Sequence, residues 1–234
     1  MSGGFSVPAH AIHTIDTVRP LDVRRLGVVS YADGLDLQAE LVVARRAGDI
    51  PDTLLLLEHP HVITLGSGSR QEHVLADAAE RAARGIELFE TGRGGDVTYH
   101  GPGQLVAYPV LDLKPDRQDL HRYLRDLESM LIRVAGAFTI GAVRSEGQTG
   151  VWTDVGKLAA IGVRVSSGWI TSHGVALNVS TDLDYFQTIV PCGIADREVT
   201  SLERELGRSV PMDEASDALV EAFCGVFERE IIVA

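Results

Sequence analysis

Apolar side chains recur at helical spacing in four stretches of the chain, and these stretches predict four helices. The clearest runs from about Arg117 to Ala137, where apolar residues at steps of three and four positions would form one buried face. Asp116 precedes this stretch, and we expect it to cap the helix. A glycine stop or a proline start helps to delimit the other predicted helices, which are Tyr31–Ala47, Glu72–Arg84 and Met212–Arg229.

Short apolar runs between these helices predict strands. After the central helix, glycines at short intervals separate four such runs, and this pattern indicates an antiparallel meander. The predicted strands are Leu26–Ser30, Thr53–Leu57, Val62–Leu65, Ile86–Glu90, Leu105–Leu111, Ala142–Arg144, Gly150–Thr153, Leu158–Val165 and Trp169–Val179. Blocks of strands with helices between them predict an α+β fold. We expect one domain over residues 21–234, preceded by a loosely ordered arm over residues 1–20, which show no periodicity.

The stretch Arg93–Gln104 follows neither periodicity. It holds four of the chain's 24 glycines and interleaves them with Arg93, Thr98, Tyr99 and His100. Glycine is needed where the backbone turns sharply or approaches a ligand closely, so we interpret this stretch as a binding loop rather than an ordinary hairpin. It is not a phosphate-binding loop, because no Gly-Lys-Ser/Thr follows and the glycine spacing does not fit the dinucleotide fingerprint.

Composition narrows the class of protein further. The 234 residues are 45% apolar and 23% charged, which is ordinary for a soluble globular protein. No apolar run approaches the roughly 18 residues of a membrane-spanning helix, and the N-terminus lacks the pattern of a secretory signal, so we expect a cytoplasmic protein. A net charge of −12 argues against broad nucleic-acid binding. His59 and His61 form a His-x-His pair with no third ligand at a usual spacing, so we expect no metal site.

Two cysteines are too few for a disulfide framework, and we interpret both as free thiols. Cys224 lies on the predicted final helix and is expected to pack as a small hydrophobe, whereas Cys192 lies in a Pro-Cys-Gly turn. A nucleophilic cysteine needs a cation to hold its thiolate, because the ordinary thiol pKa is about 8.5. The candidates are His100, His173 and Lys157, and Lys157 stands unusually at the start of an apolar strand.

Five stretches resemble, in the right order, the signature motifs of the octanoyltransferases of lipoate biosynthesis. They are Asp52–Pro60, Arg93–Leu105, Gly156–Arg164, His173–Asn178 and Pro191–Ile194. The similarity covers about Leu21–Glu230. The chain departs from the family pattern at His61 and Ile63, so we expect the pocket wall near these positions to differ. The resemblance implies the fold of lipoate and biotin protein ligases, with a mixed, largely antiparallel sheet flanked by helices.

The resemblance also implies an activity. The enzyme would move an octanoyl group from octanoyl-acyl carrier protein to a lysine of a lipoyl domain, without a cofactor. The implied acceptors are the lipoyl domains of 2-oxoacid dehydrogenase complexes and the glycine cleavage H protein. Cys192 would carry the acyl group, with Lys157 as its partner. The substrate-binding residues implied by the same match are Arg93, Gly94, Gly95, Asp96, Val97, Thr98, Tyr99, His100, Ala160, Ile161, Gly162, Gly174, Val175 and Ala176.

On this interpretation the resting enzyme pairs a Cys192 thiolate with a Lys157 ammonium. His100 and His173 are expected to orient loops or contact substrate rather than act as the base, although an imidazole would suit a Cys–His pair. Three alternatives remain at this point. An ATP-dependent lipoate or biotin protein ligase would form an adenylate and need no cysteine. A non-catalytic acyl- or acyl-carrier-binding protein would leave the thioester intact. A Cys–His hydrolase would release free acid.

Overall fold

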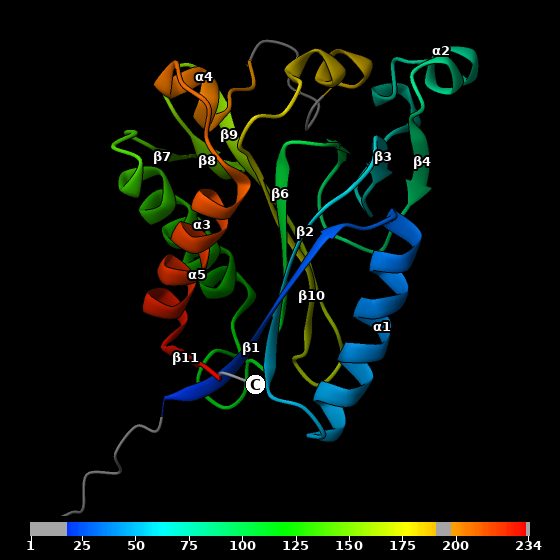
Figure 1. The fold of residues 1–234 in the computed structure, drawn as a ribbon. Coiled ribbons are helices and arrows are strands. Elements are labelled where there is room, and N and C mark those ends of the chain that lie inside the picture. Colours follow the sequence, from blue (N-terminus) through cyan, green and yellow to red (C-terminus); the bar gives the residue numbers. More distant parts are fainter. Residues whose placement is uncertain (1–17, 191–197, 233–234) are drawn as a thin grey trace, which may run out of the picture.

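The computed structural model of the protein describes residues 18–190 and 198–232. Cys192 and the whole of its motif, residues 191–194, therefore lie outside the described residues, as does nearly all of the expected N-terminal arm. An eight-stranded sheet forms the centre of the described chain (Figure 1). In spatial order its strands are β11 (Arg229–Ile231), β1 (Arg19–Val28), β2 (Asp52–Glu58), β6 (Gln104–Val110), β10 (Thr171–Asn178), β9 (Lys157–Val165), β8 (Gln148–Trp152) and β7 (Val143–Ser145).

The sheet is mixed and largely antiparallel, as expected. β1 pairs in parallel with β11 and with β2, and the other neighbours in the sheet pair antiparallel. The predicted meander is confirmed, because β7, β8, β9 and β10 lie side by side in chain order. The α+β class is confirmed with it.

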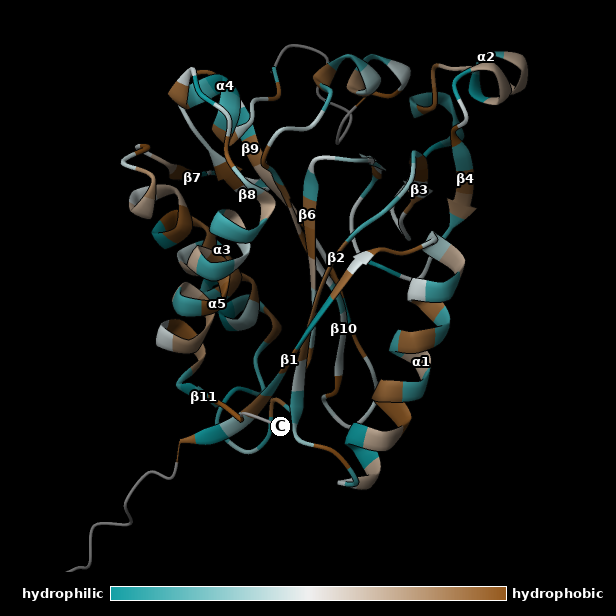
Figure 2. Cartoon of the chain, viewed as in Figure 1, coloured by the Kyte–Doolittle hydropathy of each residue, from teal (hydrophilic) through white to brown (hydrophobic). Residues whose placement is uncertain are grey.

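Helices cover both faces of this sheet (Figure 1). α3 (Leu120–Ala137) and α5 (Met212–Phe227) pack together on one face, and α1 (Tyr31–Ala47) covers the other. β2 and β6 lie between these layers, so nearly all of their residues are buried and most are hydrophobic (Figure 2). Alternate residues face opposite sides: Leu54 and Leu56 pack toward α3 and α5, whereas Leu55 and Leu57 pack toward α1.

A second sheet of three strands lies beside the first (Figure 1). Its order is β4 (Glu87–Glu90), β3 (Val62–Leu65) and β5 (Val97–His100), with β3 parallel to β4 and antiparallel to β5. β5 lies inside the predicted binding loop, so Arg93–Gln104 is two loops flanking a strand rather than one continuous loop. The remaining short elements are η1 (Gln71–His73), α2 (Ala78–Ala83), η2 (Leu183–Thr188) and α4 (Leu202–Leu206).

The helix predicted over residues 72–84 is wrong in its first half. Leu75 and Ala76 both donate their backbone N–H groups to the carbonyl of Thr188, at 2.8 and 3.1 Å, instead of forming helical hydrogen bonds. The helix begins only after Asp77, whose side chain accepts a hydrogen bond from the Glu80 N–H at 2.9 Å. The carbonyl of Thr188, which is distant in sequence, thus accepts hydrogen bonds from the N–H groups that a longer helix would use.

The central helix also begins later than predicted. Asp119 caps it, because its side chain accepts a hydrogen bond from the Arg122 N–H at 3.1 Å. Arg117 lies in the preceding turn, where its buried guanidinium pairs with Asp126 at 2.6 Å and Glu228 at 2.8 Å. These ion pairs tie the turn to the side of α3 and to the end of α5, so Arg117 stays outside the helix.

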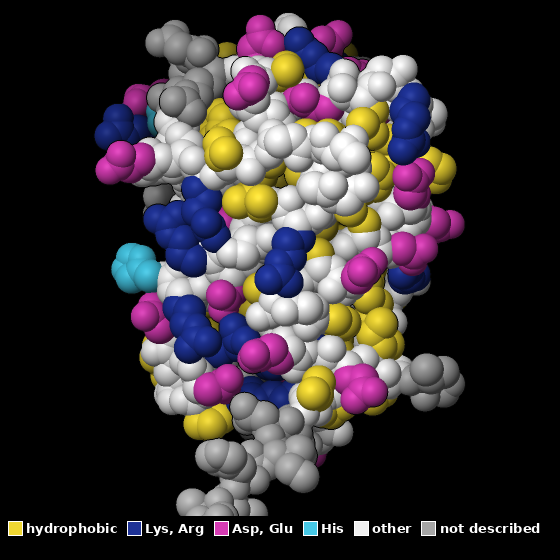
Figure 3. Space-filling model, turned by 90° about the vertical axis from the view of Figure 1, so that its left-hand side faces the viewer, with side chains coloured by type: hydrophobic (Ala, Val, Ile, Leu, Met, Phe, Trp, Pro, Cys, Tyr) yellow, Lys and Arg dark blue, Asp and Glu magenta, His cyan; other side chains and the backbone are white. Residues whose placement is uncertain are grey.

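The strand predicted over residues 26–30 corresponds to the end of β1, which begins at Arg19 within the range assigned to the arm. Charged side chains in this strand obscure its apolar pattern. On the face in Figure 3 basic, acidic and hydrophobic side chains are mixed. None of the helices in the described part of the chain is long and apolar enough to span a membrane.

Candidate functional site

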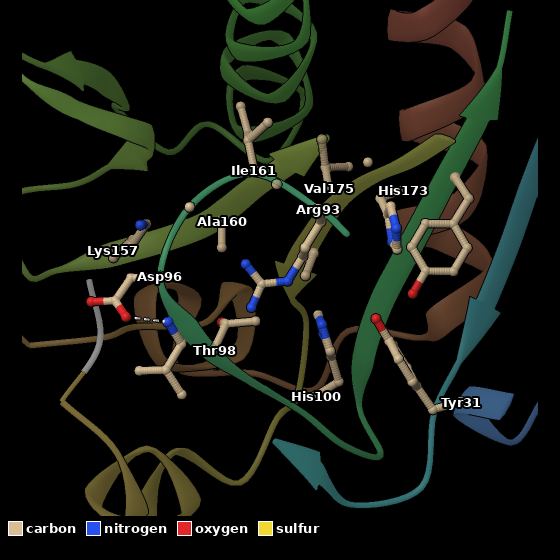
Figure 4. Close-up of a pocket in the computed structure, with 16 residues that line it drawn as sticks. Tyr31, Arg93, Asp96, Thr98, His100, Lys157, Ala160, Ile161, His173 and Val175 are labelled. Carbon is tan, nitrogen blue, oxygen red and sulfur yellow. Dashed lines mark hydrogen bonds between the residues drawn. The ribbon is translucent and has the colours of Figure 1, made fainter. Parts of the chain in front are cut away.

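A cavity lies between the β9–β10 pair and the Arg93–His100 segment (Figure 4). Its empty space, open mouth included, is about 520 Å³. Six of the eight predicted binding residues from the segment line it, and so do all six from β9 and β10, together with Lys157. The lining residues predicted from the sequence are Arg93, Gly95, Asp96, Val97, Thr98, His100, Ala160, Ile161, Gly162, Gly174, Val175 and Ala176.

Small residues on one face of β9 and β10 create the space. Ala160 pairs directly with Ala176, and Ile161 pairs with Val175. Side chains alternate along a strand, so neighbouring pairs point to opposite faces of the sheet. Ile161 and Val175 direct their side chains away from Arg93 (Figure 4) and belong to the core under α3 and α5. The apolar side chains that β9 and β10 present to the cavity are therefore mainly the two alanines.

Gly174 has a different task from these alanines. It brings β10 close to β6, and a Cβ at this position would lie 2.1 Å from the carbonyl oxygen of Ala107. Its neighbour His173 has a φ of 56°, in the left-handed region, and its N–H donates to Gln38 Oε1 at 2.7 Å. The hydrogen bond to Gln38 on α1 thus stabilises the left-handed backbone that places His173 in the cavity wall.

Arg93 is buried in the opposite wall. Its guanidinium donates to the Thr64 hydroxyl at 2.8 and 3.1 Å and to the Thr64 carbonyl at 2.6 Å. Gly94 does not line the cavity, but its N–H donates to the Val163 carbonyl at 2.8 Å and ties the segment to β9. Asp96 accepts hydrogen bonds from the Val97 N–H at 2.7 Å (Figure 4) and from His73 Nδ1 at 2.6 Å.

Tyr99 is the other predicted residue that does not line the cavity. It lies between Thr98 and His100 on β5, so alternation directs it to the far side. There its hydroxyl is 2.7 Å from Nδ1 of His61, and Ile63 packs in the same separate core. Neither position 61 nor position 63 is among the residues that line this cavity.

Both cavity histidines are neutral at neutral pH. His100 Nδ1 donates to Gln104 Oε1 at 2.7 Å, because the Gln104 amide nitrogen is committed to Asn178 Oδ1 at 2.9 Å. Burial, reinforced by neighbouring His59, lowers the pKa of His100 to about 3. Burial and the nearby guanidinium of Arg93 lower the pKa of His173 to about 4. Neither imidazole therefore supplies the cation that a thiolate needs.

Two tyrosines of the lining, Tyr31 and Tyr108, were not predicted from the sequence. Tyr108 donates its hydroxyl to His59 Nε2 at 2.9 Å, because His59 Nδ1 donates to the Val29 carbonyl at 2.7 Å. His59 is thus a support behind the cavity rather than half of a metal pair. In the described residues, no group of three or more His, Cys, Asp or Glu side chains is placed to hold a metal ion.

Lys157 lies where the cavity meets the start of β9 and is only 7% exposed. Its backbone is held on both sides, since its N–H donates to the Glu198 carbonyl at 2.9 Å and its carbonyl accepts from the Thr200 N–H at 3.0 Å. Its Nζ lies 5.2 Å from the centre of the Trp152 ring. Cys192, its predicted partner, belongs to the segment outside the described residues.

Comparison with known proteins places the chain in a family. Residues 30–224 match the family described as the lipoyl protein ligase A/B catalytic domain. An octanoyltransferase from Chloroflexus aggregans is 49% identical over 213 residues, covering 90% of this chain and 96% of its own. An octanoyltransferase from Myxococcus xanthus is 50% identical over 220 residues, covering 92% of this chain and 61% of its own. The chain belongs to the octanoyltransferases of the lipoyl protein ligase A/B family.

Solved structures confirm that this octanoyltransferase-family chain shares the fold of the ligases. The bi-partite lipoate protein ligase from Thermoplasma acidophilum superposes with a TM-score of 0.67 at 18% identity, over 91% of this chain and 88% of that chain. The biotin protein ligase from Aquifex aeolicus, in complex with biotin and ATP, has a TM-score of 0.55 at 16% identity, over 88% and 70% of the two chains. At such low identities these matches concern the fold alone.

Proposed function

We propose that this chain moves an octanoyl group from octanoyl-acyl carrier protein to a lysine of a lipoyl domain, through a thioester on Cys192. The acceptors would be the lipoyl domains of 2-oxoacid dehydrogenase complexes and the glycine cleavage H protein. One observation carries the proposal: a buried lysine, Lys157, stands at the end of a cavity whose floor is formed by small apolar side chains. Membership of the octanoyltransferases and the Pro191–Ile194 motif support the role of Cys192.

In the first half-reaction the Cys192 thiolate attacks the carbonyl carbon of the donor thioester. The bond from that carbon to the phosphopantetheine sulfur breaks, and the acyl group is left on Cys192. The Lys157 ammonium gives its proton to the departing sulfur, so the carrier leaves as a neutral thiol and Lys157 becomes an amine. Neutral His100 and His173 lack the positive charge for the thiolate and instead shape the cavity wall.

In the second half-reaction the acceptor lysine arrives as an ammonium. It gives one proton to the Lys157 amine and attacks the acyl carbon of the Cys192 thioester. The carbon–sulfur bond breaks, an amide forms, and the nitrogen releases its remaining extra proton to solvent. The Cys192 thiolate and the Lys157 ammonium are restored. No ATP is consumed, because a thioester is converted into a more stable amide.

The acyl chain would lie in the cavity beside Ala160 and Ala176. Each methylene removed from water contributes about 0.8 kcal/mol, so an eight-carbon chain contributes several kcal/mol to binding. This attraction would hold the thioester carbonyl beside Lys157 while Arg93 and the Gly94 backbone bond keep the opposite wall in place.

Intact-mass measurement tests the proposal. The native chain, mixed with octanoyl-carrier thioester but no ATP or acceptor, should gain one octanoyl group. Cys192→Ser should gain none, and Lys157→Ala should acylate far more slowly. Cys224→Ser is the matched control, because Cys224 packs on α5 beside the core and should not affect transfer. Turnover that appears only with ATP would instead indicate a ligase, and an acyl adduct on Cys192→Ser would contradict the covalent route.

A further inference from the structure

We propose that Trp152 is a positioning residue that holds the Lys157 side chain at the cavity and stabilises its ammonium form. This rests on the proposed function, in which Lys157 gives a proton to the leaving thiol. The two residues are directly opposite each other on antiparallel strands β8 and β9. The Lys157 Nζ lies 5.2 Å from the centre of the Trp152 ring. An ammonium within about 6 Å of a ring centre is attracted by the negative face of the ring, and indole attracts it most strongly.

Burial makes this contact important. Lys157 is 7% exposed and Trp152 is 6% exposed, so water solvates neither side chain fully. Removal of an ammonium from water favours its neutral amine, which has no proton to give to a leaving sulfur. The indole face attracts the charged form and so offsets part of this loss. The ring is thus placed to favour the form of Lys157 that the first half-reaction uses.

The methylene groups of Lys157 pack against β8, the strand that also carries Trp152. Gly150 lies two residues before Trp152, and its φ of 130° lies in the region that favours glycine. A Cβ at Gly150 would lie 2.7 Å from Lys157 Cε and 2.6 Å from the Ala159 carbonyl oxygen. β8 therefore presents an empty position to the lysine stem and an aromatic ring to its ammonium.

Other charged groups line the same cavity. Arg93 is positive and disfavours the ammonium, Asp96 is negative and favours it, and the imidazoles of His100 and His173 are neutral. From the segment that packs on the Lys157 backbone, Glu198 directs its side chain to Arg204 at 3.1 Å. A substitution at Trp152 leaves all of these groups in the chain, so a changed pH profile reports the loss of the ring.

The test is the pH dependence of single-turnover acylation of Cys192, followed by intact mass. The rate should fall on the alkaline side as the proton needed by the leaving sulfur is lost. Trp152→Leu should move that alkaline midpoint to lower pH by about 0.4–1.5 units, which corresponds to a cation–π attraction of about 0.5–2 kcal/mol. Trp152→Phe keeps an aromatic face and should recover most of the shift. An unchanged midpoint in Trp152→Leu, or an equal shift in both variants, overturns the inference.

A second measurement preserves the shape of the ring. The chain has two tryptophans, so in a Trp169→Phe background Trp152 is the one tryptophan left. Fluorinated tryptophan incorporated there should lower the alkaline midpoint in steps, because each fluorine withdraws electron density from the ring face. The same labelling in Trp152→Phe, which retains Trp169, should leave the alkaline midpoint unchanged. A midpoint insensitive to fluorine overturns the inference even if Trp152→Leu fails to fold. Absence of any adduct on the native chain would overturn the proposed function itself.

Discussion

Replacement of Ala160 by leucine should exclude long acyl chains from the cavity and spare short ones. Ala160 lies three residues along β9 from Lys157, which is about 10 Å at the usual strand rise. An extended octanoyl chain reaches that far, whereas a butanoyl chain covers about half the distance. Leucine adds three carbon atoms at this point of the cavity. If they displace three methylenes of the acyl chain, the loss is about 2.4 kcal/mol at 0.8 kcal/mol each. That corresponds to a roughly 50-fold lower kcat/KM.

The assay compares octanoyl- and butanoyl-carrier thioesters as donors for acylation of Cys192. In Ala160→Leu, kcat/KM for octanoyl should fall by about 50-fold, while kcat/KM for butanoyl should be nearly unchanged. Ala47→Leu is the control, because Ala47 is exposed at the far end of α1. Equal losses with both donors would mean that the leucine disturbs Lys157 rather than the acyl chain. An unchanged kcat/KM with both donors would mean that the acyl chain does not lie beside Ala160.

Three further predictions concern stability, measured by urea unfolding. Folding lowers the pKa of His100 from 6.5 to about 3, so the unfolded chain binds more protons and stability should fall as pH drops from about 6.5 toward 3. His100→Asn should flatten that dependence, and parallel curves would contradict it. Asp119→Ala should cost about 1 kcal/mol and Asp116→Ala less, because only Asp119 caps α3; the reverse order would contradict that cap. Gly174→Ala should be strongly destabilising, whereas Gly136→Ala on α3, with open space around it, should not be; equal effects would refute the close approach of β10 to β6.

Elements with a strong internal pattern were predictable from the sequence. α3 places apolar residues on one face, and the glycines between residues 142 and 179 separate the meander strands. The failures have one physical cause, which is pairing with distant segments. β1 carries charged residues such as Arg24 and becomes a strand through its pairing with β2 and β11. The residues after η1 lose their helix because Thr188 accepts their backbone hydrogen bonds.

The candidate site follows the same rule. The glycine-rich segment was predictable from its unusual composition, and the β9–β10 residues from the resemblance of their motifs to those of the octanoyltransferases. Tyr31 and Tyr108 were not, because they reach the cavity only when α1 covers the sheet and β6 pairs with β10. Tyr99 was included by its motif, but the alternation of β5 directs it to the opposite side.

Burial gives a physical reason to expect a lysine, rather than a histidine, beside a thiolate in this cavity. An imidazole begins near pKa 6.5, so burial alone makes it neutral at physiological pH. His100 and His173 illustrate this, with pKa values of about 3 and 4 in the same cavity. A lysine side chain begins near 10.4 and can lose several units of pKa before it loses its charge at neutral pH. An apolar floor of the kind that would suit an acyl chain thus disfavours a Cys–His pair and favours the proposed Cys–Lys pair, to which the face of Trp152 would add its attraction for the ammonium.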